Sequence, residues 1–488
     1  MVDQVYIDGS WETVATDETI TVYDPSTENV LGEVPAAGDT EVAAAAEAAA
    51  AAQSDWGLRS APERAELIDD ILTVVREHRD ELASLLTAEV GKPTSAAQDE
   101  LDFALEIGDY AVGGGRRIEG DVLPANSQSE KVTIERHPHG VVSCIVPWNF
   151  PVWIFIRKVA PALVTGNTVV AKPSSNTPLA THRLVELIDE EVDLPDGVLN
   201  FLTGHGSDLG DSMVSDGNVD MVSMTGSTGV GRQIAQTAAE SLIPASLELG
   251  GKAPAIVWKD ADLDAAVEDL ITARVSNTGQ ICTCAERIYV HSEVAEEFTE
   301  KYVAAAEDIT IGDPRDDPDI GPQVSEGELE STHQAVETAT AEGARVLTGG
   351  NPPEGEEFEN GYWYTPTVLT DVTQDMEIIQ EEVFGPVSPI IEIDSMDQAL
   401  EYANDSEYGL SSYLFTNNYR LVNRIADELE FGETYINRTL GEEAQGHHIG
   451  WNNSGLGGND GEDGKYGLLK YTKIKTLYQN YEDPAGTQ

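Results

Sequence analysis

The sequence is poor in cysteine and has no long apolar run. Its 488 residues include three cysteines, and a chain of this length cannot be held together by so few disulfides. A helix that spans a membrane needs about 18 consecutive apolar residues; no such run occurs, so we expect no membrane partner. The first residues, MVDQVYIDGSW, lack the basic and apolar regions of a signal peptide. We therefore expect a cytoplasmic protein.

Basic residues are also rare. The chain has 28 Lys and Arg against 88 Asp and Glu, a formal net charge of −60, and the carboxylates are spread along its whole length. Such a field would repel nucleic acids and anionic membranes. Molar salt shortens the screening length to about 3 Å and relieves repulsion within the chain. The composition therefore predicts a halophilic protein from a salt-rich cytoplasm, with an acidic mesophilic protein as the alternative.

The apolar patterns predict helices followed by a series of strands. An Ala-rich stretch at 41–53 favours a helix, and a second helix is expected from Ser60, where Ser60 and Glu63 form a capping box. From residue 141, short β-rich runs alternate with helical segments, which is typical of parallel βαβ units. A similar alternation after Gly251 predicts a second domain of the same α/β class. The strands expected in the first series are 141–146, 168–172, 198–202 and 219–224.

The segment 116–138 interrupts this pattern. It contains two strand-like runs around a polar turn. We expect it to form an arm that leaves the body of the protein.

Polar and glycine-rich loops follow the four strands, at 147–151, 172–175, 204–210 and 225–231. Ligands of doubly wound sheets bind at the carboxyl ends of the strands, and small residues at a helix N-terminus suit a pyrophosphate. No loop has the G-x-G-x-x-G spacing, and each alone is compatible with an ordinary turn. Together, on successive strands, the loops favour a nucleotide site.

Two residues are candidates for the reaction chemistry. Cys282 and Cys284 lie in the glycine-led segment NTGQICTC, but no His or Cys cluster supplies the remaining ligands of a metal site. We therefore expect no bound metal, and Cys144, inside an apolar strand, is interpreted as buried and inert. Cys282 fits an activated nucleophile if a partner exists. The candidate partner is Glu248, in the apolar segment LELGGK, although most glutamates are simply solvated.

Four segments, PWNFP, LELGGKAP, GQICTCAER and EEVFGP, resemble the aldehyde dehydrogenase superfamily in their order and separation. The resemblance covers essentially the whole chain. It implies a Rossmann-like cofactor domain at 1–115 and 138–250, an α/β catalytic domain at 251–440, and a β oligomerisation arm with a C-terminal segment at 116–137 and 441–488. It also implies a homo-oligomer, either a dimer or a tetramer.

The resemblance assigns roles position by position. It implies that Cys282 is the nucleophile, that Glu248 is the base that activates water, and that the Asn149 side chain donates in the oxyanion hole. Cys284 is then a bystander. Desolvation would raise the pKa of Glu248 toward the working pH. The cofactor-binding residues that it implies are Val146, Trp148, Lys172, Ser174, Ser175, Gly226, Ser227, Glu382 and Phe384.

The loop after the second strand bears on the choice between NAD and NADP. Members of the superfamily that prefer NAD usually have Glu after the KPS triplet, whereas this chain has Ser175. The absence of that carboxylate leaves room for a 2′-phosphate, with which Lys172 can pair. We therefore expect the chain to use NADP, with NAD as the alternative.

A closer resemblance concerns the substrate, a small aldehyde. The segments NTGQICTCAERIYV and GETYINRTLGEEAQGHHIGWNNSGLGG resemble the lactaldehyde and glycolaldehyde dehydrogenase subgroup. Arg157, Glu442 and His448 then stand at substrate-contacting positions, as one cation, one anion and one neutral imidazole. These residues could instead be surface charges near a turn.

Two other functions stay open. One is a semialdehyde dehydrogenase of sugar-acid breakdown, for example of 2-oxoglutarate semialdehyde, in which Arg157 would hold the distal carboxylate. The other is a catalytically silent, structural member of the superfamily. The intact set of Cys282, Glu248 and Asn149 argues against the silent member.

Overall fold

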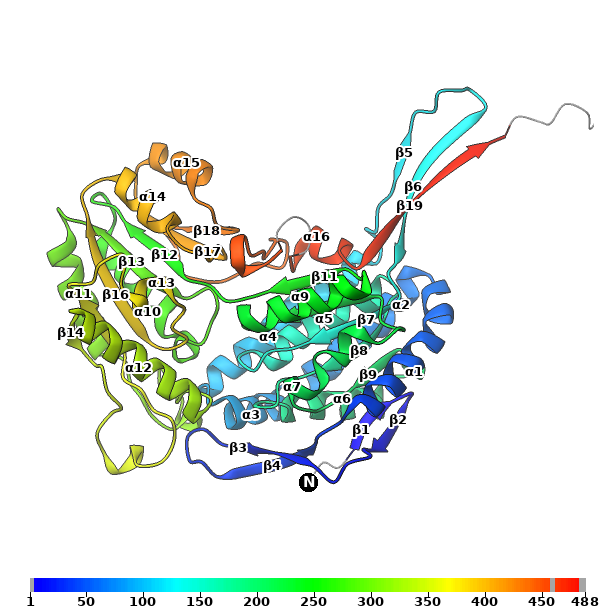
Figure 1. Ribbon diagram of the computed structural model, residues 1–488, viewed down its shortest axis with the longest axis horizontal. Helices are drawn as coiled ribbons and strands as arrows, with labels where there is room; N and C mark the ends of the chain where they lie inside the picture. Colours follow the sequence, from blue (N-terminus) through cyan, green and yellow to red (C-terminus); the bar gives the residue numbers. More distant parts are fainter. Residues whose placement is uncertain (1–3, 457–460, 482–488) are drawn as a thin grey trace, which may run out of the picture.

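The structure is a computed structural model and describes residues 4–456 and 461–481. Parts of the C-terminal segment predicted at 441–488 therefore lie outside the described residues. The fold is mixed α/β, as the sequence predicts, and Figure 1 shows two sheets side by side with an arm at one end. No helix among the described residues is long and apolar enough to cross a membrane.

Helices dominate the first part of the chain. The capping box expected at Ser60 is present: Oγ of Ser60 accepts from the Glu63 N–H at 3.4 Å, and the Glu63 carboxylate accepts from the Ser60 N–H at 2.8 Å. The predicted Ala-rich helix is also present and is longer than expected. A short hairpin, β3 (Thr19–Tyr23) and β4 (Val30–Pro35), precedes them. The helices are α1 (Asp39–Leu58), α2 (Ala61–Glu77), α3 (Arg79–Val90) and α4 (Thr94–Gly114).

The first sheet contains the four strands that the sequence predicts from residue 141. Five of its strands are parallel, and the N-terminal hairpin extends one edge in antiparallel orientation. In spatial order the strands are β11 (Ala245–Glu248), β10 (Met221–Thr225), β7 (Val141–Ile145), β8 (Thr168–Lys172), β9 (Leu199–Phe201), β1 (Gln4–Ile7) and β2 (Ser10–Thr13). The connecting helices are α5 (Pro151–Val164), α6 (Leu179–Glu191), α7 (Gly206–Leu209), α8 (Ser212–Ser215) and α9 (Thr228–Ser241).

The second sheet begins after Gly251, where the sequence predicts a second α/β unit. All of its pairings are parallel except that of β14 with β15. In spatial order the strands are β14 (Arg345–Thr348), β15 (Thr367–Thr370), β16 (Val387–Ile393), β13 (Ala285–His291), β12 (Ala253–Val257), β17 (Ser411–Phe415) and β18 (Glu433–Ile436). Its helices are α10 (Leu263–Val275), α11 (Ala295–Glu307), α12 (Glu326–Glu342), α13 (Glu377–Gln380), α14 (Met396–Asn404) and α15 (Tyr419–Glu428).

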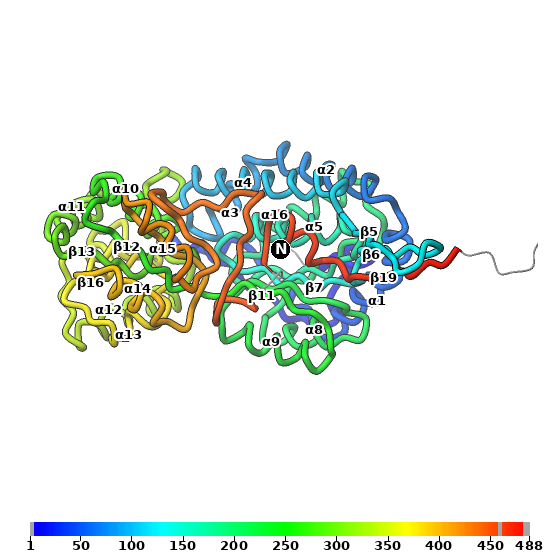
Figure 2. The backbone as a smooth tube through the Cα atoms, turned by 90° about the horizontal axis from the view of Figure 1, so that it is seen from above, coloured from blue at the N-terminus to red at the C-terminus, as the bar shows by residue number. Residues whose placement is uncertain are grey.

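The arm is a separate antiparallel sheet of β5 (Asp121–Leu123), β6 (Glu130–Pro138) and β19 (Thr472–Asn480). In both views it extends away from the body, at the end where α1 and α2 lie (Figures 1 and 2). The predicted hairpin at 116–138 is therefore confirmed as an element that leaves the body. The domain boundaries and the role of the arm in assembly stay predictions.

The C-terminal part of the chain returns from the second sheet to the first. Leu249 donates its N–H to the Ser454 carbonyl at 2.9 Å, and Gly455 forms an isolated bridge with Glu248. A short helix, α16 (Gly464–Leu469), then leads into β19. This return brings Ser454 and Gly455 next to the carboxyl end of β11.

Candidate active site

A cavity lies between the carboxyl edge of the first sheet and the segment that precedes β13. Its walls come from loops and helices next to both sheets and from the returning C-terminal segment. Most of the predicted site residues contribute to its lining: Trp148, Asn149, Arg157, Gly226, Ser227, Cys282, Glu382, Phe384 and Glu442. Chain segments up to about three hundred residues apart in sequence therefore meet at one site.

The turn before Cys282 has an unusual backbone. Asn277 and Thr278 have φ angles of 48° and 58°, and Gly279 has 77°. A left-handed conformation costs a residue with a β-carbon about 1–3 kcal/mol, so the surroundings must hold it. Thr278 donates to the Gly321 carbonyl at 3.0 Å, and the Gln280 side chain bonds Asn277 O and Val324 N at 2.9 Å each. This buried turn fixes the direction from which Cys282 enters the cavity.

The three thiols differ in their surroundings. Cys144 and Cys284 are fully buried, and burial raises the pKa of each thiol to about 12. Such cysteines are chemically inert. Cys282 is partly exposed and lines the cavity. Burial raises the pKa of its thiol too, but a hydrogen bond with the His448 side chain and the charge of His448 oppose that rise.

Asn149 lies in the turn between β7 and α5, next to the Cys282 segment. Its side-chain amide donates to the Gln280 carbonyl at 2.9 Å. The ammonium of Lys92 donates to the main-chain carbonyl of Asn149 at 2.8 Å and pairs with Glu100 at 2.6 Å. Glu100 in turn accepts the N–H of Val152 at the start of α5 at 2.9 Å. A buried ion pair thus holds the turn that carries Asn149.

Glu248 ends β11 and is 3% exposed. Within the described part of the chain, its Oε2 has no hydrogen-bond donor; the nearest cation is Nε2 of His448 at 3.7 Å. Burial raises the pKa of Glu248 to about 7, although the charge of His448 works in the opposite direction. The sequence-based expectation of a raised pKa is confirmed.

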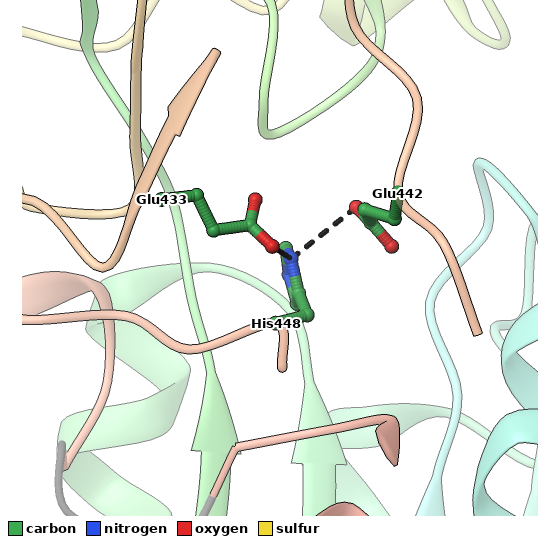
Figure 3. A group of neighbouring side chains, drawn as sticks. All are labelled: Glu433, Glu442 and His448. Carbon is green, nitrogen blue, oxygen red and sulfur yellow. Dashed lines mark hydrogen bonds and ion pairs between the residues drawn. The ribbon is translucent and has the colours of Figure 1, made fainter. Parts of the chain in front are cut away.

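His448 differs from the prediction in its charge. Nδ1 of His448 lies 3.2 Å from a Glu442 oxygen and 3.3 Å from a Glu433 oxygen, and Figure 3 shows the ring between the two carboxylates. Burial alone would lower the pKa of the imidazolium, but Glu442 and Glu433 outweigh this and hold the pKa well above its ordinary value. The expectation of a neutral imidazole is therefore wrong. The reason is Glu433 on β18, whose carboxylate the sequence did not indicate.

Arg157 lies on α5 and has two acidic partners. Its guanidinium forms a two-pronged pair with Asp463, through an Nε contact of 2.9 Å and a second contact from Nη2. Nη2 also reaches Glu442 at 2.8 Å. Arg157 is 5% exposed, so it is not a surface charge. Its donors are directed to carboxylates of the chain itself.

The cofactor side of the cavity contains the loop between β10 and α9. Ser227 caps α9, with its hydroxyl accepting from the Val230 N–H. Glu382 accepts the Gly251 N–H at 2.8 Å, and burial raises the pKa of its carboxyl to about 8. The rings of Trp148 and Phe384 meet edge to face at a centroid distance of 5.4 Å. An aromatic wall, a helix N-terminus and a half-buried carboxyl suit the parts of a dinucleotide.

Four predicted cofactor residues lie outside the lining of this cavity, at the carboxyl ends of β7 and β8. Val146 is buried and donates its N–H to the Lys172 carbonyl at 2.9 Å. The Lys172 ammonium donates to the Pro173 carbonyl at 2.9 Å, and burial lowers its pKa to about 8. Ser174 and Ser175 are partly exposed beside it.

One group of side chains at the site could hold a metal ion. Ligand atoms of Glu433, Glu442 and His448 all lie within 4.8 Å of one another, and the sequence spacing did not predict this cluster. A protonated imidazole accounts for both short contacts at Nδ1 without a metal ion. The prediction that the chain binds no metal stays a prediction.

Several site residues were missed by the sequence analysis. Lys92, Glu100, Glu433 and Asp463 are all buried or nearly buried charges with opposite-charge partners. Asp463 is 306 residues from Arg157 in sequence. Their segments carry no local signal: Glu100, for example, stands in DELDFAL between Asp99 and Asp102, which are both exposed.

Comparison with known proteins identifies the family. The sequence profile of the aldehyde dehydrogenase family matches residues 11–477, and the chain belongs to this family. The matched region includes every predicted site residue. The prediction of an oxidoreductase that acts on aldehydes is confirmed.

Individual relatives cover nearly the whole chain. The 3,6-anhydro-alpha-L-galactose dehydrogenase of Vibrio sp. (strain EJY3) is 43% identical over 98% of this chain and 99% of the relative. The D-glyceraldehyde dehydrogenase (NADP(+)) of Picrophilus torridus is 40% identical over 98% and 96%. The lactaldehyde dehydrogenase of Escherichia coli (strain K12) is 41% identical over 97% and 98%. The crystal structure of that protein matches with a TM-score of 0.95, over 98% of this chain and 99% of the other.

Proposed function

We propose that this NAD(P)-dependent aldehyde dehydrogenase oxidises a small hydroxyaldehyde, of the lactaldehyde or glycolaldehyde type, to its carboxylate through a thioester on Cys282. The observation that carries the proposal is Glu442, a carboxylate that lines the cavity with Cys282. His448 and Arg157 hold it in place. The relatives named above are dehydrogenases of 3,6-anhydro-alpha-L-galactose, D-glyceraldehyde and lactaldehyde, which supports this substrate class.

The first step is addition of the Cys282 thiolate to the aldehyde carbon. The carbonyl oxygen becomes an oxyanion, which we assign to the Asn149 side-chain amide and the Cys282 backbone N–H. A primary amide has two N–H groups, and one of those of Asn149 bonds the Gln280 carbonyl, which orients the other. Loss of one oxyanion donor typically costs ~3–4 kcal/mol in the barrier.

The cofactor, when bound, accepts the hydride that leaves the former aldehyde carbon. Gly226 and Ser227 would bind its pyrophosphate, Glu382 and Lys172 would hold its riboses, and Trp148 and Phe384 would form the wall at the nicotinamide. Val146, Ser174 and Ser175 complete its binding site.

Glu248 acts in the second half of the reaction. Its carboxylate takes a proton from water, and the hydroxide attacks the thioester to release the acid. The unsatisfied Oε2 of Glu248 is an acceptor for that water. A carboxyl whose pKa lies near 7 is well matched to a general base at neutral pH.

We further propose NADP as a cofactor that the enzyme uses. Lys172 is a buried ammonium, and burial is the cause of its lowered pKa. An anionic phosphate beside the Lys172 ammonium would offset the free-energy cost of burying its charge. Ser175 leaves the neighbouring position uncharged, and a relative 40% identical is named as an NADP(+) enzyme.

The semialdehyde alternative requires Arg157 to bind a distal carboxylate. The guanidinium of Arg157 already pairs with Asp463 and Glu442. A third carboxylate, on the substrate, would be repelled by these two. A neutral hydroxyl group, by contrast, can donate to Glu442. We therefore favour the hydroxyaldehyde over the anionic semialdehyde.

The arm is proposed to mediate assembly into a dimer or tetramer. Several of its apolar side chains are exposed, among them Val122 at 72% and Ile474 at 62%. Such residues on a projecting sheet suit a subunit contact. Light scattering after size exclusion in high salt should give a multiple of the chain mass, and a monomer would contradict the proposal.

The experiment for the substrate is a kinetic panel. Initial rates of NADP and NAD reduction are measured with lactaldehyde, glycolaldehyde, propanal and an anionic semialdehyde. We expect the two hydroxyaldehydes to exceed propanal in kcat/KM, because a buried polar group left unpaired discriminates by up to ~10⁴-fold. Equal efficiency with propanal would reject the hydroxyaldehyde, and a clear lead for the semialdehyde would select the alternative.

A further inference from the structure

The charged side chains around Cys282 bear on how its thiolate is stabilised. Aldehyde addition needs a thiolate, yet burial makes that anion unfavourable. Glu248 cannot stabilise it, because a second anion would repel it. The cation beside the thiol is His448: it lowers the pKa of the thiol, and its Nδ1 lies 3.2 Å from Glu442, which lines the cavity together with Cys282.

His448 is 3% exposed and lies among several ionisable groups. Glu442 and Glu433 contact Nδ1, and Glu248 lies on the Nε2 side at 3.7 Å. Glu433 also accepts from the Tyr435 hydroxyl at 2.9 Å. The neighbouring cation is Arg157, which Asp463 and Glu442 neutralise. One ring nitrogen, Nδ1, thus contacts two carboxylates. A proton on Nδ1 can be donated to them, and their negative charges keep that proton on the ring.

We propose that Glu433 and Glu442 hold His448 as a permanent imidazolium, and that its charge stabilises the thiolate of Cys282 before the aldehyde arrives. The inference rests on the proposed role of Cys282 as the nucleophile. On ionisation the S–H bond breaks, the electron pair stays on sulfur, and the proton leaves to water in the cavity. The Nε2–H of His448 then donates to the sulfur anion. His448 is thus a part of the nucleophile's activation, beyond any contact with the substrate.

Replacement of Glu433 distinguishes activation of Cys282 by His448 from a role of His448 in substrate binding alone. Its carboxylate contacts His448, whereas it is absent from the lining of the cavity as described. Replacement of Glu433 therefore changes the charge on His448 and leaves the wall of the cavity in place. The thiol of Cys282 should report that change.

The test measures alkylation of Cys282 by the neutral reagent iodoacetamide as a function of pH, in high salt and without aldehyde or cofactor. Peptide mass spectrometry assigns the modified cysteine. In His448→Gln we expect the midpoint of the pH–rate profile to move upward, with alkylation on its acidic side slower by ~10-fold or more, because a nearby opposite charge typically shifts a pKa by ~1–3 units. Glu433→Gln should shift the midpoint in the same direction by less.

His447→Gln is the matched control. His447 is the adjacent histidine and bonds the Glu462 carbonyl at 2.9 Å, so its replacement should leave the midpoint unchanged. Melting temperatures show whether each variant is folded, and Glu433→Gln retains the histidine if His448→Gln is unstable. Wild-type midpoints in both folded variants would overturn the proposal. A wild-type midpoint that moves on addition of EDTA would also overturn it, in favour of a metal ion in the cluster.

The outcome is independent of the substrate. A shift in the alkylation profile together with no oxidation of any aldehyde would reject the proposed function and leave the charge relationship in place. Normal oxidation with unshifted profiles would reject the role of His448 and leave the proposed function in place.

Discussion

Nε2 of His448 lies 3.7 Å from Oε2 of Glu248, and both side chains are almost completely buried. The imidazolium counteracts the desolvation of the carboxylate, and the pKa of Glu248 is raised to about 7 rather than further. A general base must be deprotonated to act. The burial of Glu248 and the charge of His448 together therefore give Glu248 a pKa that lets it act as a base near neutral pH.

Glu248→Gln should separate the two halves of the reaction. We expect a burst of NADPH or NADH close to one per site, followed by steady-state turnover slower by ~10²–10⁴-fold, the usual contribution of a general base. In the wild-type enzyme deacylation should fall as the pH drops below about 7, because protonated Glu248 cannot accept a proton. Stopped-flow absorbance at several pH values measures both phases. If the variant lost both the burst and the steady-state turnover, the assignment of Glu248 to the second half of the reaction would be wrong.

Ser175→Glu should shift the cofactor preference toward NAD. A carboxylate next to the 2′-phosphate costs several kcal/mol by like-charge repulsion, so the KM for NADP should rise by ~10²-fold while that for NAD changes little. Ser175→Gln is the control, with similar size and no charge. An enzyme that shows no NADP turnover before mutation would refute our interpretation of this loop.

Glu442→Gln should reduce the preference for hydroxyaldehydes over propanal. The amide keeps the shape of the side chain but is a weaker acceptor and removes one of the two charges that hold His448 protonated. We therefore expect a lower kcat/KM for both aldehydes, with a further loss of ~10-fold for lactaldehyde alone, as for one charged hydrogen bond. Asp463→Asn is the matched control, because Asp463 also binds Arg157 but does not appear in the lining of the cavity. An equal loss with both aldehydes would restrict Glu442 to its effect on His448 and remove it from substrate recognition.

The acidic surface predicts a requirement for salt. With a net charge of −60, repulsion between carboxylates is screened within about 3 Å in molar salt but only within about 10 Å in 0.1 M salt. Dialysis into dilute buffer should therefore abolish activity and near-ultraviolet circular dichroism together. A fully folded, active enzyme in dilute buffer would favour the acidic mesophilic alternative.

The strands and helices that position the site were predictable because their signals are local. The capping box at Ser60 and the alternation from residue 141 depend on neighbours within a few positions. The left-handed turn at Asn277 and Thr278 carries no such signal, since its hydrogen bonds come from segments more than forty residues away.

The residues of the site were predictable from resemblance, but the charge state of His448 was not. The spacing in EEAQGHH does not show that Glu433 reaches His448 from β18, and so the imidazole was expected to be neutral. In the same way, Arg157 was assigned to the substrate because nothing in the sequence places Asp463 beside it. Long-range pairing of buried charges requires the folded chain.

The most direct test of the account is the mass of the enzyme during turnover. Glu248→Gln is mixed with lactaldehyde and NADP, quenched in acid within the burst, and digested for mass spectrometry. We predict a mass increase of one lactoyl group on Cys282, with none on Cys284, which is fully buried, and none in Cys282→Ser/Glu248→Gln. An acyl group on another residue, or a burst of reduced cofactor without any acyl-enzyme, would contradict the thioester mechanism.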